Sequence, residues 1–145
     1  MGVATKYESD YYGWTLEQLE LLRSGKLAEI DVENLIEELE SMGASERREL
    51  LNRLALLMGH LLKWQYQPEY RGSSWARTIR EQRRMIPVHI KQNPSLKGRM
   101  DEFMLDGYEL GRGLASDETG LPENTFPESC PWTFEQAMNP DLWPE

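Results

Sequence analysis

The chain of 145 residues is poor in several residue types that common functional sites require. It has a single cysteine, Cys130, and two histidines, which excludes an internal disulfide and a cysteine-based zinc site. No apolar run approaches the roughly 20 residues that cross a bilayer. The first residues also lack the apolar segment of a signal peptide. We therefore expect a protein of the reducing cytoplasm that does not enter a membrane.

Sequence motifs of catalysis are missing as well. There is no Gly-x-Ser-x-Gly nucleophile motif and no glycine-rich phosphate loop. Cys130 lies between Ser129 and Pro131, with no neighbouring histidine to activate its thiol. We predict no catalytic residue, no bound metal and no cofactor, which makes an enzyme the less favoured class.

Charge of one sign is concentrated in separate blocks. Residues 1–70 carry 7 basic and 13 acidic groups, and residues 100–145 carry 1 basic and 11 acidic groups. Residues 71–99 carry 8 basic groups and 1 acidic group, a net charge of +7 in a chain whose net charge is −9. The simplest interpretation is mutual neutralisation across the fold, and a basic face open to an acidic partner is the alternative.

Helical periodicity runs through most of the chain, whereas alternation typical of strands is scarce. It predicts an all-α, single-domain bundle of four to five main helices. An N-terminal arm (1–14) should precede the bundle (15–115). Five prolines after residue 116 predict an irregular C-terminal strap over the bundle (116–145).

Helix signals divide the first half of the chain into three helices. The first should cover 16–24, and the second should begin after Asp31 and stop at Gly43. The second helix has one apolar stripe opposite a glutamate face (stripe: Val32, Leu35, Ile36, Leu39, Met42; face: Glu33, Glu37, Glu40). Ser45 should cap a third, broadly apolar helix that ends at Pro68.

Two more helices should follow before the strap. The fourth turns Trp75, Ile79, Gln82, Ile86 and Ile90 inward, and Pro87 should kink or break it. The fifth should start after Ser95 and present a packing seam in which Gly107 allows a neighbour to approach closely. Within the strap, Thr133 and Gln136 predict a capped short helix at 134–138.

The turn from Trp64 to Trp75 is rich in aromatic, amide and arginine side chains, which are common in binding surfaces and also in rigid corners of small cores. We expect Trp64 and Trp75 to be core residues, and Gln65, Gln67 and Arg71 to bind exposed carbonyls at helix ends. The alternative is a protein-binding surface anchored by Tyr66, Gln67, Tyr70 and Arg71.

A basic face on the fourth helix is the clearest functional lead. Arg77, Arg80 and Arg84 recur at spacings of three and four and therefore project together. Such a face can bind phosphates. The competing interpretation is that the protein's own carboxylates neutralise these arginines, and the sequence pI near 4.8 favours it. The pairs would join Arg77, Arg80 and Arg83 to Glu33, Glu37, Glu38 or Asp101.

His60 and Glu38 form a weak candidate polar site. His60 has no second metal ligand one helical turn away, so we expect a hydrogen-bonded structural histidine. Glu38 lies nearer the apolar stripe than its neighbours and is the better candidate for a buried ion pair. A cryptic metal-dependent or hydrolytic site near His60 and the glutamate-rich helix remains an alternative function.

Several motifs together resemble a known family. They are Asp10-Tyr11-Tyr12-Gly13-Trp14-Thr15, Asp31 to Leu39 with Met42-Gly43, Ser45 to Leu50, His60 to Pro68, and Ser74 to Ile79. The chain is similar over residues 7–140 to the bacterial Domain of Unknown Function 29 family. The resemblance implies an all-helical fold and transfers no activity and no catalytic residue.

By elimination, we expect a small interaction or regulatory protein whose partner is another protein. Nucleic-acid binding through the fourth helix is the alternative. The oligomeric state is not determined by the sequence.

Overall fold

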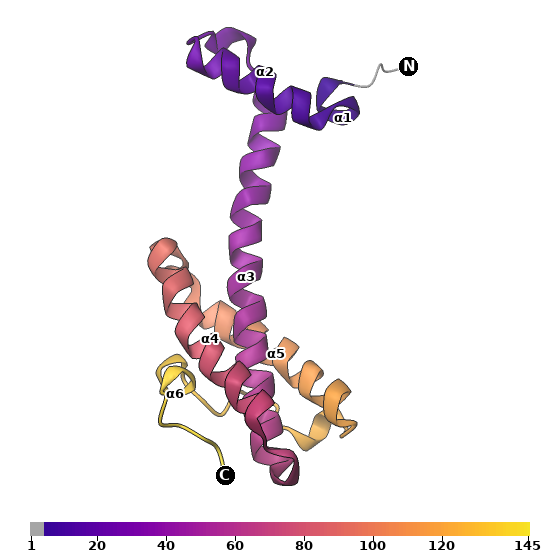
Figure 1. Ribbon diagram of the computed structural model, residues 1–145, viewed down its shortest axis with the longest axis vertical. Helices are drawn as coiled ribbons and strands as arrows, with labels where there is room; N and C mark the ends of the chain where they lie inside the picture. The colour runs from indigo at the N-terminus through magenta and orange to yellow at the C-terminus, as the bar shows by residue number, and fades with distance from the viewer. Residues whose placement is uncertain (1–4) are drawn as a thin grey trace. The chain divides into compact units, whose positions relative to one another are not determined.

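The computed structural model describes residues 5–145, and its regular secondary structure is helical throughout this range (Figure 1). The predicted all-α class is confirmed. Four helices exceed a dozen residues: α2 (Tyr11–Arg23), α3 (Val32–Tyr66), α4 (Ser73–Gln92) and α5 (Met100–Thr119). Shorter elements are α1 (Lys6–Ser9), α6 (Phe134–Met138) and the 3-10 turns η1 (Leu27–Glu29), η2 (Pro68–Tyr70), η3 (Pro94–Arg99) and η4 (Glu123–Thr125).

The contacts divide the chain into two compact units, an N-terminal unit (Met1–Ala44) and a C-terminal unit (Ser45–Glu145). Residues 32–44 of α3 belong to the first unit and residues 45–66 to the second. The prediction of one domain with an N-terminal arm stays a prediction.

The N-terminal unit is held together by polar contacts around one aromatic cluster. Asp10 caps α2 by accepting from the backbone N–H of Gly13, so α2 begins at Tyr11 rather than at Leu16 as predicted. The indole of Trp14 is buried and donates to Asp31 at 3.0 Å. Gln18, also buried, accepts from the backbone N–H of Asp31 at 2.7 Å. Trp14 and Gln18 are the two residues that are fully buried in the described part of this unit.

The predicted break at Gly43 is wrong, because α3 runs without interruption from Val32 to Tyr66. An interior glycine costs a helix only about 1 kcal/mol, which the flanking helix formers offset. Ser45 is consequently an interior residue and not an N-cap. Pro87 does not break α4, which continues through it to Gln92. The fifth helix begins at Met100, after the 3-10 turn η3, and not directly after Ser95.

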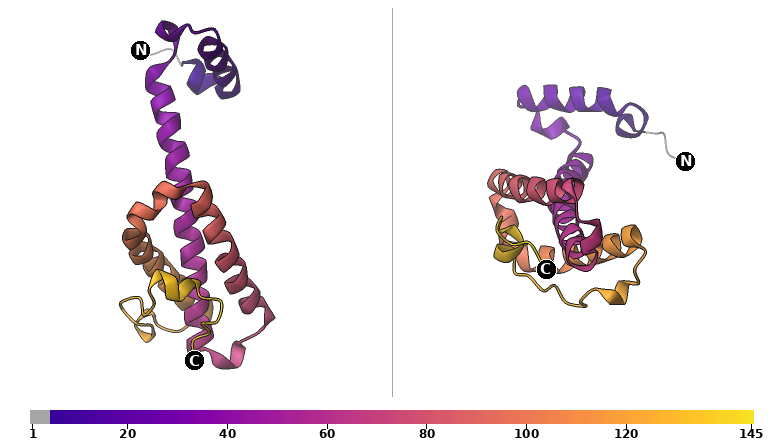
Figure 2. Two further views of the ribbon diagram at one scale, coloured as in Figure 1. Left: turned by 90° about the vertical axis from the view of Figure 1, so that its left-hand side faces the viewer. Right: turned by 60° about the horizontal axis from the view of Figure 1, so that its bottom comes forward.

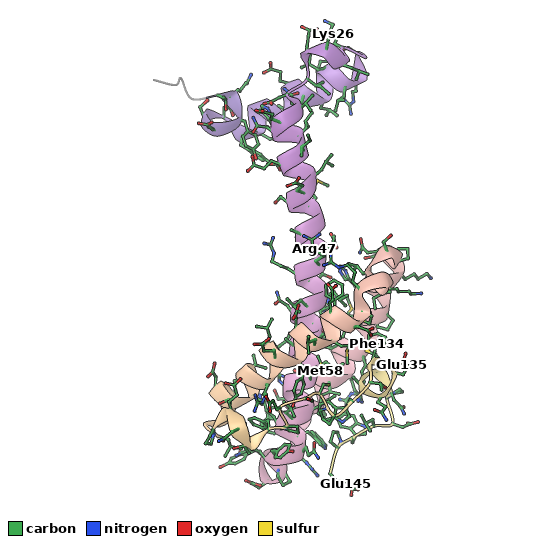
Figure 3. The ribbon with its side chains drawn as sticks, turned by 180° about the vertical axis from the view of Figure 1, so that it is seen from behind. Lys26, Arg47, Met58, Phe134, Glu135 and Glu145 are labelled. Carbon is green, nitrogen blue, oxygen red and sulfur yellow. The ribbon has the colours of Figure 1, made fainter. Side chains whose placement is uncertain are left out.

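The core of the C-terminal unit lies where α4 and α5 pack on the second half of α3 (Figure 1). The helix α3 supplies most of it, with Leu50, Leu54, Leu57, Met58, Leu61 and Leu62 fully buried. Figure 3 labels Met58 on this helix. The inward positions predicted for α4 are confirmed for Ile79, Gln82, Ile86 and Ile90, whereas Trp64 and Trp75 are half-buried.

Helices α3 and α5 approach each other at glycines. A Cβ added at Gly111 would lie 2.7 Å from the carbonyl oxygen of Ala55 and 3.0 Å from the backbone nitrogen of Gly59. A Cβ at Gly107 would lie 3.0 Å from Cβ of Leu54, which confirms the close approach predicted there. Backbone therefore faces backbone at this crossing.

The strap after α5 crosses the C-terminal unit and is tied down along its length. Phe126 is buried and meets the ring of Tyr66 edge-on at 5.3 Å. The α6 helix has the predicted capping box, in which Thr133 and Gln136 bond reciprocally. The chain from α6 onward, yellow in Figure 2, lies beside α4, where Arg83 donates to the carbonyls of Ala137 and Leu142.

The glycine crossing gives a matched pair of substitutions. Gly111→Ala should lower the free energy of unfolding by about 1–3 kcal/mol, because the new methyl group meets backbone that cannot move aside. Gly113→Ala, two residues on, meets no atom within 4 Å and should raise it by about 0.5–1 kcal/mol. Urea denaturation of both variants measures the difference, and equal stabilities would contradict the close packing.

Candidate functional site

The predicted aromatic turn is mostly a structural corner. Arg71 donates through Nε to the carbonyl of Trp64 at 2.6 Å and through a terminal nitrogen to the carbonyl of Pro144 at 3.2 Å. Its predicted role of binding a helix-end carbonyl is confirmed. Tyr66 and Gln67 are half-buried, and Tyr70, at 65% exposure, is the one side chain of this candidate surface that is largely open to solvent.

The basic face of α4 is open. Arg77, Arg80 and Arg84 are exposed, and within residues 45–145 none of them forms an ion pair. The expected pairing with Asp101 is therefore wrong. Arg83, one position from Arg84, differs completely from it: it is buried, stacks 5.5 Å from the Trp143 ring and binds backbone carbonyls.

Arg83 is a buried guanidinium whose side-chain partners among the described residues include no carboxylate. Burial lowers the pKa of its guanidinium from the ordinary value, and one terminal nitrogen has no hydrogen-bond partner. The two carbonyls that it binds belong to the strap, so its role is to fasten the strap to α4. Within residues 45–145, Arg83 binds backbone carbonyls and no glutamate, in contrast to the ion pairs that we predicted.

His60 and Glu38, the weak candidate polar site, belong to different units and have their own partners. The Nδ1–H of His60 donates to the carbonyl of Leu56 at 2.8 Å, which leaves Nε2 as the acceptor of a neutral ring. Burial, followed by the nearby charge of Lys63, lowers the pKa of His60. In the N-terminal unit, the phenol groups of Tyr11 and Tyr7 donate to Glu38, and these hydrogen bonds lower the pKa of the Glu38 carboxyl. The hydrogen bond to Glu38 in turn raises the pKa of Tyr7 to about 12.

One polar cluster was not anticipated. Ring nitrogen Nδ1 of the buried His89 lies 2.9 Å from a carboxylate oxygen of Glu49, and Nε2 lies 3.0 Å from the carbonyl oxygen of Glu46. The side chains of Glu46, Glu49 and His89 could offer three ligand atoms to a metal ion. However, Arg53 already contacts the same oxygen of Glu49 at 3.3 Å, and a guanidinium there disfavours a cation.

This cluster therefore resembles a polar contact between α3 and α4 more than a metal centre. Sequence reasoning missed the cluster because none of the residues one turn before or after His89, namely Met85, Ile86, Gln92 and Asn93, is a histidine, cysteine or carboxylate. The two glutamates come from another helix, and no spacing in the sequence reports that contact.

Lys63 was missed for a different reason. It interrupts the apolar run Leu61-Leu62-Lys63-Trp64 and is buried, with its amine 4.7 Å above the Trp75 ring and 3.4 Å from Glu118. A lysine inside an apolar stretch is the signal that could have indicated a buried amine.

An apolar groove of about 640 Å³ lies between the end of α4, η3 and α6. Its lining includes Ile90, Met100, Phe134 and Met138, with Lys91, Lys97 and Glu135 among the charged groups. Phe134 and Glu135 are labelled in Figure 3. The residues that line the groove include no nucleophile paired with a base.

Most of the exposed large apolar side chains in the described residues lie in the N-terminal unit. Of the fifteen large apolar side chains that are exposed in residues 5–145, ten belong to this unit. On α3 the stripe is Val32, Ile36, Leu39 and Met42, with exposures of 54%, 50%, 65% and 63%. We call these four residues the α3 stripe. It was predicted as an amphipathic face, and the structure leaves it uncovered.

The lowered pKa of His60 implies a dependence of stability on acid. Below the unfolded-state pKa near 6.5, the unfolded chain binds a proton that the native His60 does not, so the stability contributed by the neutral ring falls as the pH drops. His60→Gln should therefore be less sensitive than the wild type between pH 7 and pH 5. Urea titrations at several pH values measure this, and parallel curves for the two proteins would contradict it.

None of the helices in the described residues is long and apolar enough to cross a membrane. Among curated proteins and solved structures, none matches the chain. The family model described as Domain of unknown function DUF29 matches residues 6–143, which include the whole range 7–140 over which the motifs indicated a resemblance. The chain belongs to the DUF29 family.

Proposed function

We propose that this protein is a cytoplasmic protein-interaction module and that the α3 stripe of its N-terminal unit is the interaction surface. The observation that carries the proposal is the exposure of this stripe: four large apolar side chains at helical spacing, each at least half open to solvent. Soluble monomers rarely leave contiguous apolar surface uncovered, and a larger patch usually marks a binding site.

The small core of the N-terminal unit supports this function. Trp14 is its one buried large apolar side chain in the described residues, and polar contacts to Asp31 and Glu38 provide the remaining order. A segment of this size gains little stability from such a core. A partner that covers the α3 stripe would supply the burial that the unit itself lacks.

Exposure of single apolar residues is ordinary, and the C-terminal unit illustrates it. Leu105 on α5 is 71% exposed, more than any residue of the α3 stripe, but it has no comparable row of exposed apolar neighbours. Leu105 is therefore a suitable control: it matches the stripe in exposure and differs from it in context.

A photo-crosslinking amino acid at position 39 tests the interaction surface. In cells, the variant with the crosslinker in place of Leu39 should give a discrete protein adduct. Adding Ile36→Gln to that variant should reduce the yield of the adduct at least severalfold. The same crosslinker at Leu105 should give no such adduct. The proposal fails if position 39 forms no adduct, or if the adducts at positions 39 and 105 are alike.

A second candidate function is phosphate binding by α4, because Arg77, Arg80 and Arg84 share one exposed face without an ion pair in the C-terminal unit. Three aligned guanidinium groups can contact successive phosphates of a nucleic acid.

This candidate predicts measurable binding of a fluorescent single-stranded DNA at low salt. For each phosphate contact, the logarithm of the binding constant should fall by about 0.7 for every tenfold increase in salt concentration. Replacing Arg77, Arg80 and Arg84 with Gln should abolish binding. Arg47→Gln with Arg48→Gln is the control, since both arginines are exposed on α3 and Arg47 projects from it (Figure 3). Absence of binding at low salt would eliminate this function.

A further inference from the structure

We infer that the partner of the α3 stripe is a cationic amphipathic helix: a helix with apolar residues at spacings of three and four, flanked by Lys or Arg. This inference rests on the proposed function and adds the chemistry of the partner. It depends on the shape of the stripe and on the charges beside it.

The shape of the stripe fits a helix. Val32, Ile36, Leu39 and Met42 follow one another at spacings of four, three and three along a regular helix. The row extends about 15 Å at 1.5 Å per residue. A second helix that packs along α3 can insert its own side chains between these four, as helices do when ridges fill grooves or knobs fill holes.

The charge beside the stripe selects the partner. At about 100° per residue, Glu40 and Glu33 lie about 40° and 60° round α3 from Ile36, at the edge of the stripe, and Glu37 lies about 100° from it, towards the opposite face. All three are exposed and have no ion pair within the described part of the N-terminal unit. Residues 1–44 contain 10 acidic and 3 basic residues, a net charge of −7. A partner with Lys or Arg at its flanks would place opposite charges next to these glutamates.

A second copy of the chain fits less well. If two α3 stripes packed antiparallel, the edge with Glu33, Glu37 and Glu40 would face the same edge of the other copy. If they packed parallel, it would face the edge that carries Glu38, whose carboxylate already accepts from Tyr7 and Tyr11. Like charges would meet directly in the antiparallel arrangement, and like-charge contacts oppose association.

An anionic membrane surface is disfavoured by the same glutamates. Amphipathic helices that lie on such membranes carry Lys and Arg on their polar face, which is the reverse of the α3 pattern. The acidic edge thus distinguishes a basic protein helix from both a second copy and a bilayer.

The test uses the full chain and three synthetic peptides of equal length. The first is a Leu–Lys peptide with its leucines on one helical face. The second contains the same residues in scrambled order, and the third has Glu in place of every Lys. Fluorescence anisotropy should show that the first binds at least tenfold more tightly than either of the others.

Variants then locate the binding. Ile36→Gln with Leu39→Gln should weaken binding of the Leu–Lys peptide at least tenfold, whereas Leu105→Gln should leave it unchanged. Glu37→Gln with Glu40→Gln should weaken it severalfold and reduce its dependence on salt. Circular dichroism checks that the helices persist, which is expected because all of these side chains are exposed.

The outcomes separate the inference from the proposed function. Equal binding of the scrambled peptide, or retention of binding by the Ile36 and Leu39 double variant, overturns the inference. If the protein instead associates with itself and that double variant makes it monomeric, the α3 stripe is an interface for a second copy: the interaction function stands and the cationic partner is wrong. If the protein binds anionic phospholipid vesicles and the double variant abolishes that binding, the inference and the proposed function are both overturned. They are also both overturned if the Leu–Lys peptide does not bind and the crosslinker at position 39 forms no adduct.

Discussion

The C-terminal unit depends on one contact, the crossing of α3 and α5 at Gly59 and Gly111, where no side chain separates the two backbones. Because α5 lies so close, Met58 and Leu54 are enclosed, and the core that α3 brings to this crossing is continuous. The start of the strap depends on the same placement: Tyr108, on α5, donates to the carbonyl of Pro127, and Arg112 donates to that of Phe126. A wider crossing would move these donors away from the strap.

The N-terminal unit is built on a different principle. Its order comes from hydrogen bonds that converge on Asp31 and Glu38, donated by an indole and two phenols, and from the packing of the buried Trp14 against Tyr7 and Tyr11. The apolar residues that would usually form a core lie on the outside, in the α3 stripe. The sequence of residues 32–44 of α3 is typical of an amphipathic helix that packs its apolar face on a core. In the structure, the α3 stripe is instead exposed to solvent. This contrast is the physical basis of the proposed function.

Local signals in the sequence were sufficient for the helices and insufficient for the contacts between them. The capping box at Thr133 and the inward positions Ile79, Gln82, Ile86 and Ile90 of α4 were predicted correctly, because capping and helical periodicity are read within a few turns. The close approach at Gly107 was predicted from the seam of its own helix, which did not name Leu54 as the neighbour. Gly43 misled because its local cost is small compared with the helix around it. Pro87 does not break α4, and the kink predicted there stays a prediction. Arg83 and His89 could not be assigned: their partners, the strap carbonyls and Glu49, come from distant parts of the chain.

The carbonyl partners of Arg71 and Arg83 have a consequence for how the two units respond to their surroundings. Amide carbonyls do not titrate, so acid leaves the acceptors that hold the strap unchanged. The N-terminal unit relies on Glu38, whose pKa the two phenols lower; the stability that this carboxylate contributes is present above its ordinary pKa and is lost as the pH falls through its lowered value. Strong acid therefore removes the Glu38 tie among α1, α2 and α3, whereas the carbonyl acceptors that Arg71 and Arg83 bind at the strap keep their charge state.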